Sequence, residues 1–267
     1  MKKPAPPFVS IAVIIVCLLV TAAIHLLPFP GTIHETAIFF GAFYKPFILC
    51  GEWYRFLTAG FIHIAPMHLM MNMLALYMLG AMIERLYGPW RFLFLLVSSS
   101  ICSYLFLFCM SGNILAIGLS GGIYGLLAAA VFQVIKIRGW RYPPLRRAMI
   151  ETLVLNGIIN FLPGVAWQGH LGGFLGGLLL AISLNKEFLE GTLRKHAAIA
   201  LTLLCVMMGT AVALNWRIPN DAPVYVQTDA YVLQGMEQYG RSAYAEEMAK
   251  KLDLLYGVHI LERGVVR

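Results

Sequence analysis

The sequence predicts an all-α polytopic membrane protein. Of the 267 residues, 60% are apolar and only 12% are charged, whereas ordinary soluble domains carry about 25% charged residues. The mean hydropathy is +0.76. Apolar runs recur at lengths near the roughly 20 residues that a helix needs to cross a hydrocarbon core. These observations place the chain in a bilayer.

Seven runs qualify as membrane spans. They lie at about 8–28, 66–84, 90–110, 115–135, 149–166, 168–185 and 196–215. The fifth and sixth are the least regular, because Pro163 and Gly164 interrupt them and the fifth carries Glu151, Asn156 and Asn160. The first run exceeds the 7–15 residues usual for a signal peptide. We therefore expect an uncleaved helix, although the small residues at 21–23 leave cleavage open.

Basic residues predict the orientation, because cytoplasmic loops carry an excess of Lys and Arg. With a cytoplasmic N-terminus, the outer loops hold only Lys45 and Arg55. The inner segments hold Lys2, Lys3, Arg85, Arg91, Lys136, Arg138, Arg141, Arg146, Arg147, Lys186, Arg194 and Lys195. The loop at about 29–65 and the tail at 216–267 would then lie outside the cytoplasm. Lys2 and Lys3 without a transit-like leader favour a bacterial plasma membrane, and a eukaryotic secretory membrane stays open.

The net charge of +7 does not indicate nucleic-acid binding, because the basic residues occupy short gaps between apolar runs instead of one soluble face. The five cysteines stand singly without metal-ligand spacing, so we interpret them as packing residues. In the tail, Glu246 and Lys250, like Glu247 and Lys251, have the i,i+4 order that supports a helix.

A serine and a histidine form the candidate catalytic pair. Ser120, in the string Gly118-Leu-Ser-Gly-Gly-Ile-Tyr124-Gly, lies shortly inside a span that runs inward from the outer face, and His170 lies similarly in another. A serine needs a neighbouring base to become a nucleophile. Gly121 and Gly125, together with the glycines at 169, 173 and 177, would let these two spans approach closely.

Other residues near this depth supply the remaining parts of a hydrolytic site. His68 and Asn72 share one helix face at i,i+4 and would donate hydrogen bonds to an oxyanion with the Ser120 N–H. Tyr124, one turn from Ser120, would stack on His170. Because no Asp or Glu lies in the outer halves of the spans, a dyad is favoured over a triad.

Each feature has a simpler interpretation. A serine between glycines in a membrane helix is usually a packing residue, and the hydrolase elbow that shares this pattern needs a strand–turn–helix context. A lone histidine can bond a backbone carbonyl or serve a proton path. The catalytic hypothesis depends on their convergence at one depth on three helices.

Taken together, residues 50 to 185 resemble the rhomboid intramembrane proteases. Ser120 with Gly118, Gly121 and Tyr124 is similar to that family's nucleophile motif, and His170 with its following glycines is similar to the base motif. His63, His68 and Asn72 match the histidine and asparagine helix, whose second histidine and asparagine bind the oxyanion. Trp53-Tyr54-Arg55 resembles the Trp-Arg element of the first outer loop, with Tyr54 interrupting the usual adjacent pair. Gly80, Glu84 and Arg85 resemble structural elements at the inner end of the same helix.

The resemblance implies a six-helix rhomboid core over 1–195, with a first span at about 8–28, an outer loop at about 29–65 and catalytic spans at about 66–84, 115–135 and 168–185. A seventh transmembrane helix at 196–215 and a small soluble helical tail at 216–267 would follow. It further implies a serine endopeptidase that cuts single-span membrane proteins among membrane lipids, without metal or cofactor. The helix at 149–166 and the loop after it would correspond to the lateral gate and cap.

Two other functions stay open. A catalytically inactive relative that binds membrane clients would be expected to lack the serine or the histidine, and both are present here. A transporter or channel would normally carry acidic residues near the midplane, whereas Glu84 and Glu151 fall near the cytoplasmic span ends.

Overall fold

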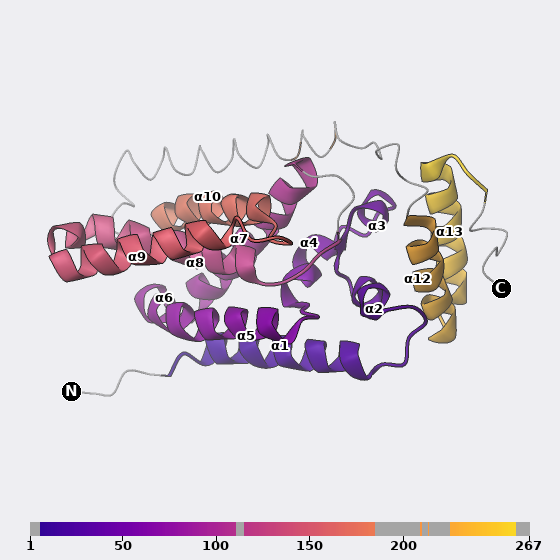
Figure 1. The fold of residues 1–267 in the computed structure, drawn as a ribbon, viewed down its shortest axis with the longest axis horizontal. Helices are drawn as coiled ribbons and strands as arrows, with labels where there is room; N and C mark the ends of the chain where they lie inside the picture. The colour runs from indigo at the N-terminus through magenta and orange to yellow at the C-terminus, as the bar shows by residue number, and fades with distance from the viewer. Residues whose placement is uncertain (1–5, 111–114, 185–208, 210–212, 214–224, 260–267) are drawn as a thin grey trace.

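The membrane part is a bundle of helices. The computed structural model describes residues 6–110, 115–184, 209, 213 and 225–259. The predicted seventh span at 196–215 therefore lies outside the described residues, apart from positions 209 and 213. The bundle contains α1 (Phe8–Leu26), α5 (Pro66–Ala75), η2 (Leu76–Gly80), α6 (Ala81–Tyr87), α7 (Pro89–Met110), α8 (Ser120–Lys136), α9 (Pro143–Ile159) and α10 (Trp167–Ser183). Figure 1 shows α1, α5, α9 and α10 running along the long axis of the molecule.

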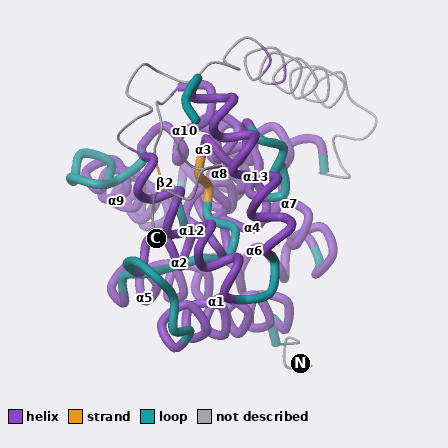
Figure 2. Tube along the Cα trace, turned by 90° about the vertical axis from the view of Figure 1, so that its right-hand side faces the viewer, coloured by secondary structure: helices purple, strands orange, loops and turns teal. Residues whose placement is uncertain are grey.

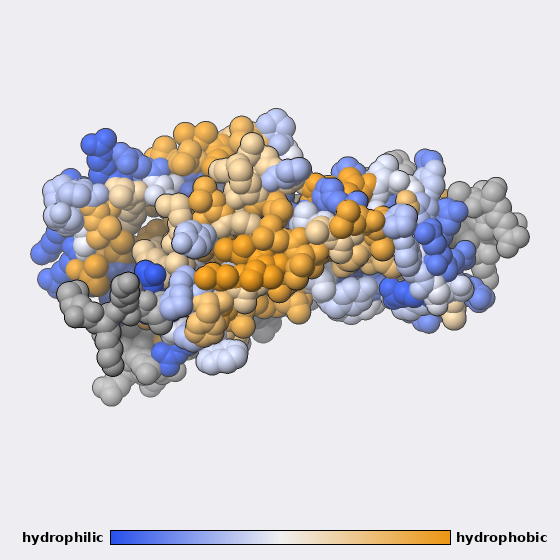
Figure 3. Space-filling view, turned by 90° about the horizontal axis from the view of Figure 1, so that it is seen from below, coloured by the Kyte–Doolittle hydropathy of each residue, from blue (hydrophilic) through white to orange (hydrophobic). Residues whose placement is uncertain are grey.

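Three helical stretches are long and apolar enough to cross a membrane, namely Phe8–Leu26, Pro66–Tyr87 and Pro89–Met110. The helix α8 is also apolar but is shorter. Figure 3 shows an apolar band across the middle of one face, with hydrophilic residues toward both ends. Large apolar side chains such as Leu19, Met71 and Met78 are exposed at the protein surface. Their exposure fits a surface that faces lipid instead of water.

The start of the predicted fourth span is wrong. Leu115–Ala116 form a short strand, β2, that pairs antiparallel with β1 (Phe43–Tyr44), so the fold is not purely helical. Gly118 follows with a φ of +105°, a conformation that suits glycine and interrupts a helix. The helix α8 therefore begins at Ser120 and not at 115, and Ser120 occupies its first turn.

The predicted fifth span is shifted. The helix α9 covers Pro143–Ile159 and not 149–166, with Pro143 and Pro144 in its first turn, where a missing N–H costs nothing. The segment between α9 and α10 is a turn. The other described spans lie close to their predicted positions.

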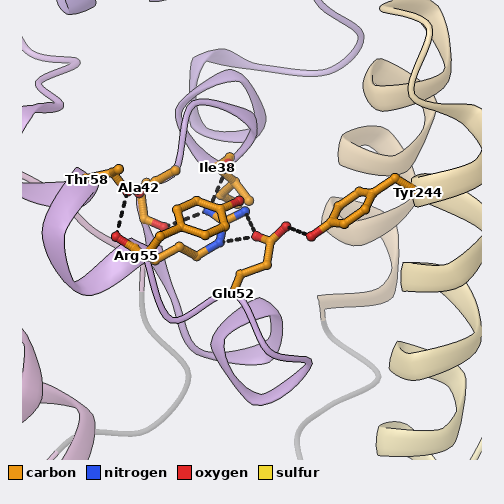
Figure 4. Close-up of polar contacts among 8 residues, drawn as sticks. Ile38, Ala42, Glu52, Arg55, Thr58 and Tyr244 are labelled. Atoms are coloured by element: carbon orange, nitrogen blue, oxygen red, sulfur yellow. Dashed lines mark hydrogen bonds and ion pairs between the residues drawn. The ribbon is translucent and has the colours of Figure 1, made fainter.

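The loop at 29–65, which was predicted to lie outside, is itself folded. It contains α2 (Ile33–Phe39), β1, α3 (Lys45–Leu49), α4 (Arg55–Thr58) and the 3-10 turn η1 (Ala59–Phe61). The fully buried Arg55 forms an ion pair with Glu52 and donates to the carbonyl oxygens of Ile38 at 2.6 Å and Ala42 at 2.8 Å. Figure 4 shows this guanidinium joining segments of the loop.

The tail is a helical hairpin that packs on this loop. It consists of α12 (Val226–Gln238) and α13 (Ser242–Tyr256), and Figures 1 and 2 place both at the end that carries α2 and α3. An apolar cluster joins Ile38, Tyr44 and Phe47 of the loop to buried hairpin residues such as Met236 and Leu252. The predicted pairs Glu246–Lys250 and Glu247–Lys251 are present in α13.

Candidate active site

Ser120 and His170 lie together at the N-terminal ends of α8 and α10. The distance from Ser120 Oγ to His170 Nε2 is 2.9 Å, which is a hydrogen bond between a hydroxyl and an imidazole. The backbone before Ser120 is fixed on both sides, because Gly118 donates its N–H to the Ala59 carbonyl at 2.9 Å and accepts from Tyr104 Oη at 2.8 Å. The predicted nucleophile thus follows a turn that hydrogen bonds hold in place, and it lies within hydrogen-bonding distance of the predicted base.

Glycines allow this approach, as the sequence predicted. A Cβ added to Gly173 would lie 2.1 Å from the carbonyl oxygen of Gly121, and one added to Gly177 would lie 2.3 Å from Cα of Gly125. No side chain fits at these contacts. The backbones of α8 and α10 therefore touch directly, and this contact sets the separation of Ser120 and His170.

Tyr124 stacks on His170, which is the predicted arrangement. The ring centroids are 4.1 Å apart with an interplanar angle of 12°. Tyr124 Oη donates to the Asn156 carbonyl oxygen at 2.9 Å, so the ring is held at its far end by α9. The stacking restricts the plane of the imidazole.

Asn160 is a site residue that the sequence analysis did not assign to the site. Its Oδ1 lies 2.6 Å from His170 Nδ1, on the side of the ring opposite Ser120. The signal was present, because an amide side chain near the end of an otherwise apolar span is unusual. In the sequence alone, this amide predicts only an irregular span.

His68 lies beside the serine turn. A Cβ added to Gly118 would lie 2.5 Å from His68 Cε1, so only glycine lets the two come this close. The buried ring of His63 packs edge-on against His68 with centroids 5.0 Å apart. This packing places the His68 ring next to the backbone that leads into Ser120.

Asn72 has another partner in this structure. Its Nδ2 donates to the His68 carbonyl oxygen at 2.9 Å within the same helix, while its Oδ1 is buried without a partner. Nδ2 carries two N–H groups, and this bond uses one of them. The structure therefore brings Ser120, His170, Tyr124, Gly118, Gly121 and His68 together and leaves Asn72 turned toward its own helix.

The remaining motif residues hold segments together. Glu84 accepts hydrogen bonds from the backbone N–H of Val9 and Ser10 at 3.0 and 2.8 Å, which ties α6 to the start of α1. A Cβ on Gly80 would meet Ser10 Oγ at 3.0 Å. Arg55 is buried in the outer loop, as described above, and Trp53 is 46% exposed.

A hydroxyl and an imidazole in contact within an apolar helical bundle define an integral membrane protein with the constellation of a serine hydrolase. The rhomboid domain family model matches residues 50–187. The chain belongs to the rhomboid family.

Curated relatives agree. The chain is 30% identical to the rhomboid protease GluP of Bacillus subtilis over 213 residues, which are 79% of this chain and 40% of that protein. It is 30% identical to the rhomboid protease AarA of Providencia stuartii over 174 residues, 55% of this chain and 61% of that protein. With RHOMBOID-like protein 4 of Arabidopsis thaliana, the identity is 37% over 141 residues, 50% and 34% of the two chains. These alignments cover less than two thirds of each relative.

Proposed function

We propose that this chain is an intramembrane serine endopeptidase that hydrolyses peptide bonds in or near the transmembrane helices of single-span membrane proteins. The observation that carries the proposal is the 2.9 Å contact between Ser120 Oγ and His170 Nε2, made within the helical bundle of a rhomboid domain. Names of relatives as proteases support the reaction class.

The reaction would follow the order of acyl transfer. Ser120 Oγ attacks the scissile carbonyl while His170 Nε2 takes the hydroxyl proton, and His170 then returns that proton to the leaving amine. The Ser120 N–H and His68, with the second N–H of Asn72 Nδ2, would hold the oxyanion. Water then hydrolyses the acyl-enzyme, with His170 acting again as base.

The proposal extends to the membrane orientation of the chain and to its division into domains. The N-terminus would be cytoplasmic, the active site would lie near the outer face of a bacterial plasma membrane, and the 216–267 tail would lie outside. The division into a six-helix core at 1–195 and a seventh span at 196–215 belongs to the same proposal. The folded outer loop and the hairpin would then share the extracytoplasmic side with Ser120.

The test is cleavage of a model single-span substrate by the full chain in liposomes. We expect cleavage by the parent and its loss in Ser120→Ala and His170→Ala, because neither group replaces the other. Ser183→Ala and His34→Ala are matched controls, since Ser183 Oγ bonds only its own helix at Leu179 and His34 lies in the exposed first turn of α2.

Retention of cleavage in Ser120→Ala would overturn the assignment of the nucleophile. Absence of cleavage by the parent over a panel of single-span substrates, together with co-purification of intact membrane clients, would favour the client-binding alternative.

A further inference from the structure

The helix α9 is held differently from its neighbours. None of its residues is buried, whereas α8 and α10 each bury much of one face. A cavity of about 530 Å³ lies between α9 and these two helices, lined by apolar side chains such as Leu127, Leu153 and Phe174 and by His170. Apolar packing therefore contributes little to the position of α9.

The polar contacts of α9 with the bundle gather at its C-terminal end. Asn160 caps the helix and lies 2.6 Å from His170 Nδ1. Its Nδ2 donates to Tyr124 Oη at 3.2 Å and to the Asn156 carbonyl oxygen at 2.9 Å. Tyr124 Oη donates to the same carbonyl. These bonds connect α9 to the predicted base and to the ring stacked on it.

The direction of these bonds fixes the proton on the imidazole. Because Asn160 Nδ2 is the donor to Tyr124 and to its own helix, the atom facing His170 is the amide oxygen, which has only lone pairs. In a neutral imidazole one nitrogen donates and the other accepts. Nδ1 must then carry the proton, and Nε2 is left as the acceptor for the Ser120 hydroxyl.

We propose that Asn160 is a positioning residue that completes a Ser120–His170–Asn160 triad and couples the position of α9 to the base. When the end of α9 lies against α8 and α10, Asn160 holds the tautomer in which Nε2 can accept a proton. When that end moves away, the imidazole loses its restraint at Nδ1, and the tautomer and ring orientation are no longer set. The inference rests on the proposed function for its catalytic consequence.

Three variants of α9 test the proposal by cleavage kinetics of the full chain in liposomes. Asn160→Leu keeps the approximate size but removes the acceptor, so we expect kcat to fall about tenfold with little change in KM. Asn160→Asp restores an acceptor and should recover most of that loss. Thr152→Val is the control, because its hydroxyl bonds only the Ala148 carbonyl on the same helix, and its rate should equal that of the parent.

The pH profile separates positioning from packing. A carboxylate at position 160 favours the imidazolium, so the acidic limb of the Asn160→Asp profile should move to higher pH. The titratable groups that face His170 are Tyr124 from α8 and His68 from α5, and neither changes in this variant. Parent-like kinetics in Asn160→Leu, or an equal loss in both variants with an unmoved profile, would overturn the proposal.

A second readout does not depend on proteolysis. The ¹⁵N spectrum of the histidines, assigned with His170→Ala, should show His170 protonated at Nδ1 in the parent and a mixture of tautomers in Asn160→Leu. A parent proton on Nε2 would overturn the pairing. If the pairing is observed but the parent cleaves nothing, the proposed function fails while the inferred contact stands.

Discussion

The α8–α10 crossing and the helix α9 supply the same site by different physical means. In the crossing, glycines bring two backbones into contact, and the position of His170 relative to Ser120 is set by repulsion between atoms that have no room to move. In α9, no residue is buried, and Asn160 reaches His170 through a few hydrogen bonds at the helix end. Ser120 is therefore held at a fixed position relative to the imidazole, whereas Asn160 can move away from it.

This difference indicates how a membrane hydrolase can be both precise and accessible. In the proposed reaction, the pair that transfers the proton needs a constant geometry, and close packing of backbones provides it. Under the proposed function a substrate segment must also enter the bundle, and this entry requires a helix whose displacement costs little free energy. Hydrogen bonds each contribute only about 0.5–1.5 kcal/mol net, so an element held mainly by them meets that requirement.

The largest expected effect comes from adding a methyl group to the crossing. In Gly173→Ala, the new Cβ would lie 2.1 Å from the Gly121 carbonyl oxygen, and a backbone atom cannot turn aside as a side chain can. We expect a loss of about 3 kcal/mol of stability or more and no measurable cleavage, checked by thermal unfolding in detergent and by substrate assay.

Gly157→Ala is the matched control on α9. A Cβ there meets nothing within 4 Å, and alanine favours the helix by up to about 1 kcal/mol. The variant should be as stable as the parent or slightly more so. Equal destabilisation by the two substitutions would mean that α9 is packed as closely as the crossing, which would remove the contrast between them.

The tail hairpin is attached to the loop both by apolar packing and by hydrogen bonds. The hydrogen-bonded part should respond to pH. Asp229 is fully buried, and burial raises the pKa of its carboxyl from the ordinary 3.8 to about 7, although hydrogen bonds from Tyr256 and Tyr44 act in the opposite direction. The titratable groups that face it are these two tyrosines and Cys50. The docked hairpin therefore binds the proton more tightly than the free hairpin does.

The sign of the effect follows from linkage. A raised pKa in the docked state gives stability that is complete below about pH 4 and is lost as the pH rises toward 7. Hydrogen exchange of α12 and α13, corrected for the intrinsic rate, should become faster over this window. Asp229→Asn should flatten the dependence, whereas Glu237→Gln, at an exposed position of α12, should retain it. A parent profile that is already flat would contradict the prediction.

The sequence predicted the glycine crossing and its consequences because that contact depends on residue size and spacing alone. Gly121, Gly125, Gly173 and Gly177 can be placed on facing helices without coordinates. The stack of Tyr124 on His170 follows from the same register. Helix periodicity and small residues thus carried the prediction of how Ser120 and His170 meet.

The sequence did not predict features that depend on a turn or on a distant partner. The helix α8 begins at Ser120, later than the predicted start at about 115. The reason is that Gly118 adopts a positive φ and that Leu115–Ala116 pair with the strand Phe43–Tyr44. The sequence does not identify Asn160, because a carboxylate is the usual partner of a catalytic imidazole, although an amide oxygen also accepts a hydrogen bond from Nδ1. The docking of the hairpin joins residues about 190 positions apart, such as Tyr44 and Asp229, and no local pattern reports such a contact.

The smallest expected effect isolates the attachment of α9 from the base itself. Tyr124→Phe keeps the ring that stacks on His170 but removes the hydroxyl that bonds α9 at Asn156 and Asn160. We expect cleavage to fall about threefold, in line with the loss of a modest hydrogen bond, and hydrogen exchange at the C-terminal end of α9 to rise while exchange in α10 does not change. Tyr142→Phe is the control, because Tyr142 is an exposed residue at the opposite end of α9 and should affect neither measurement. Unchanged exchange in Tyr124→Phe would mean that the bonds of the tyrosine hydroxyl to Asn156 and Asn160 do not hold that end of α9.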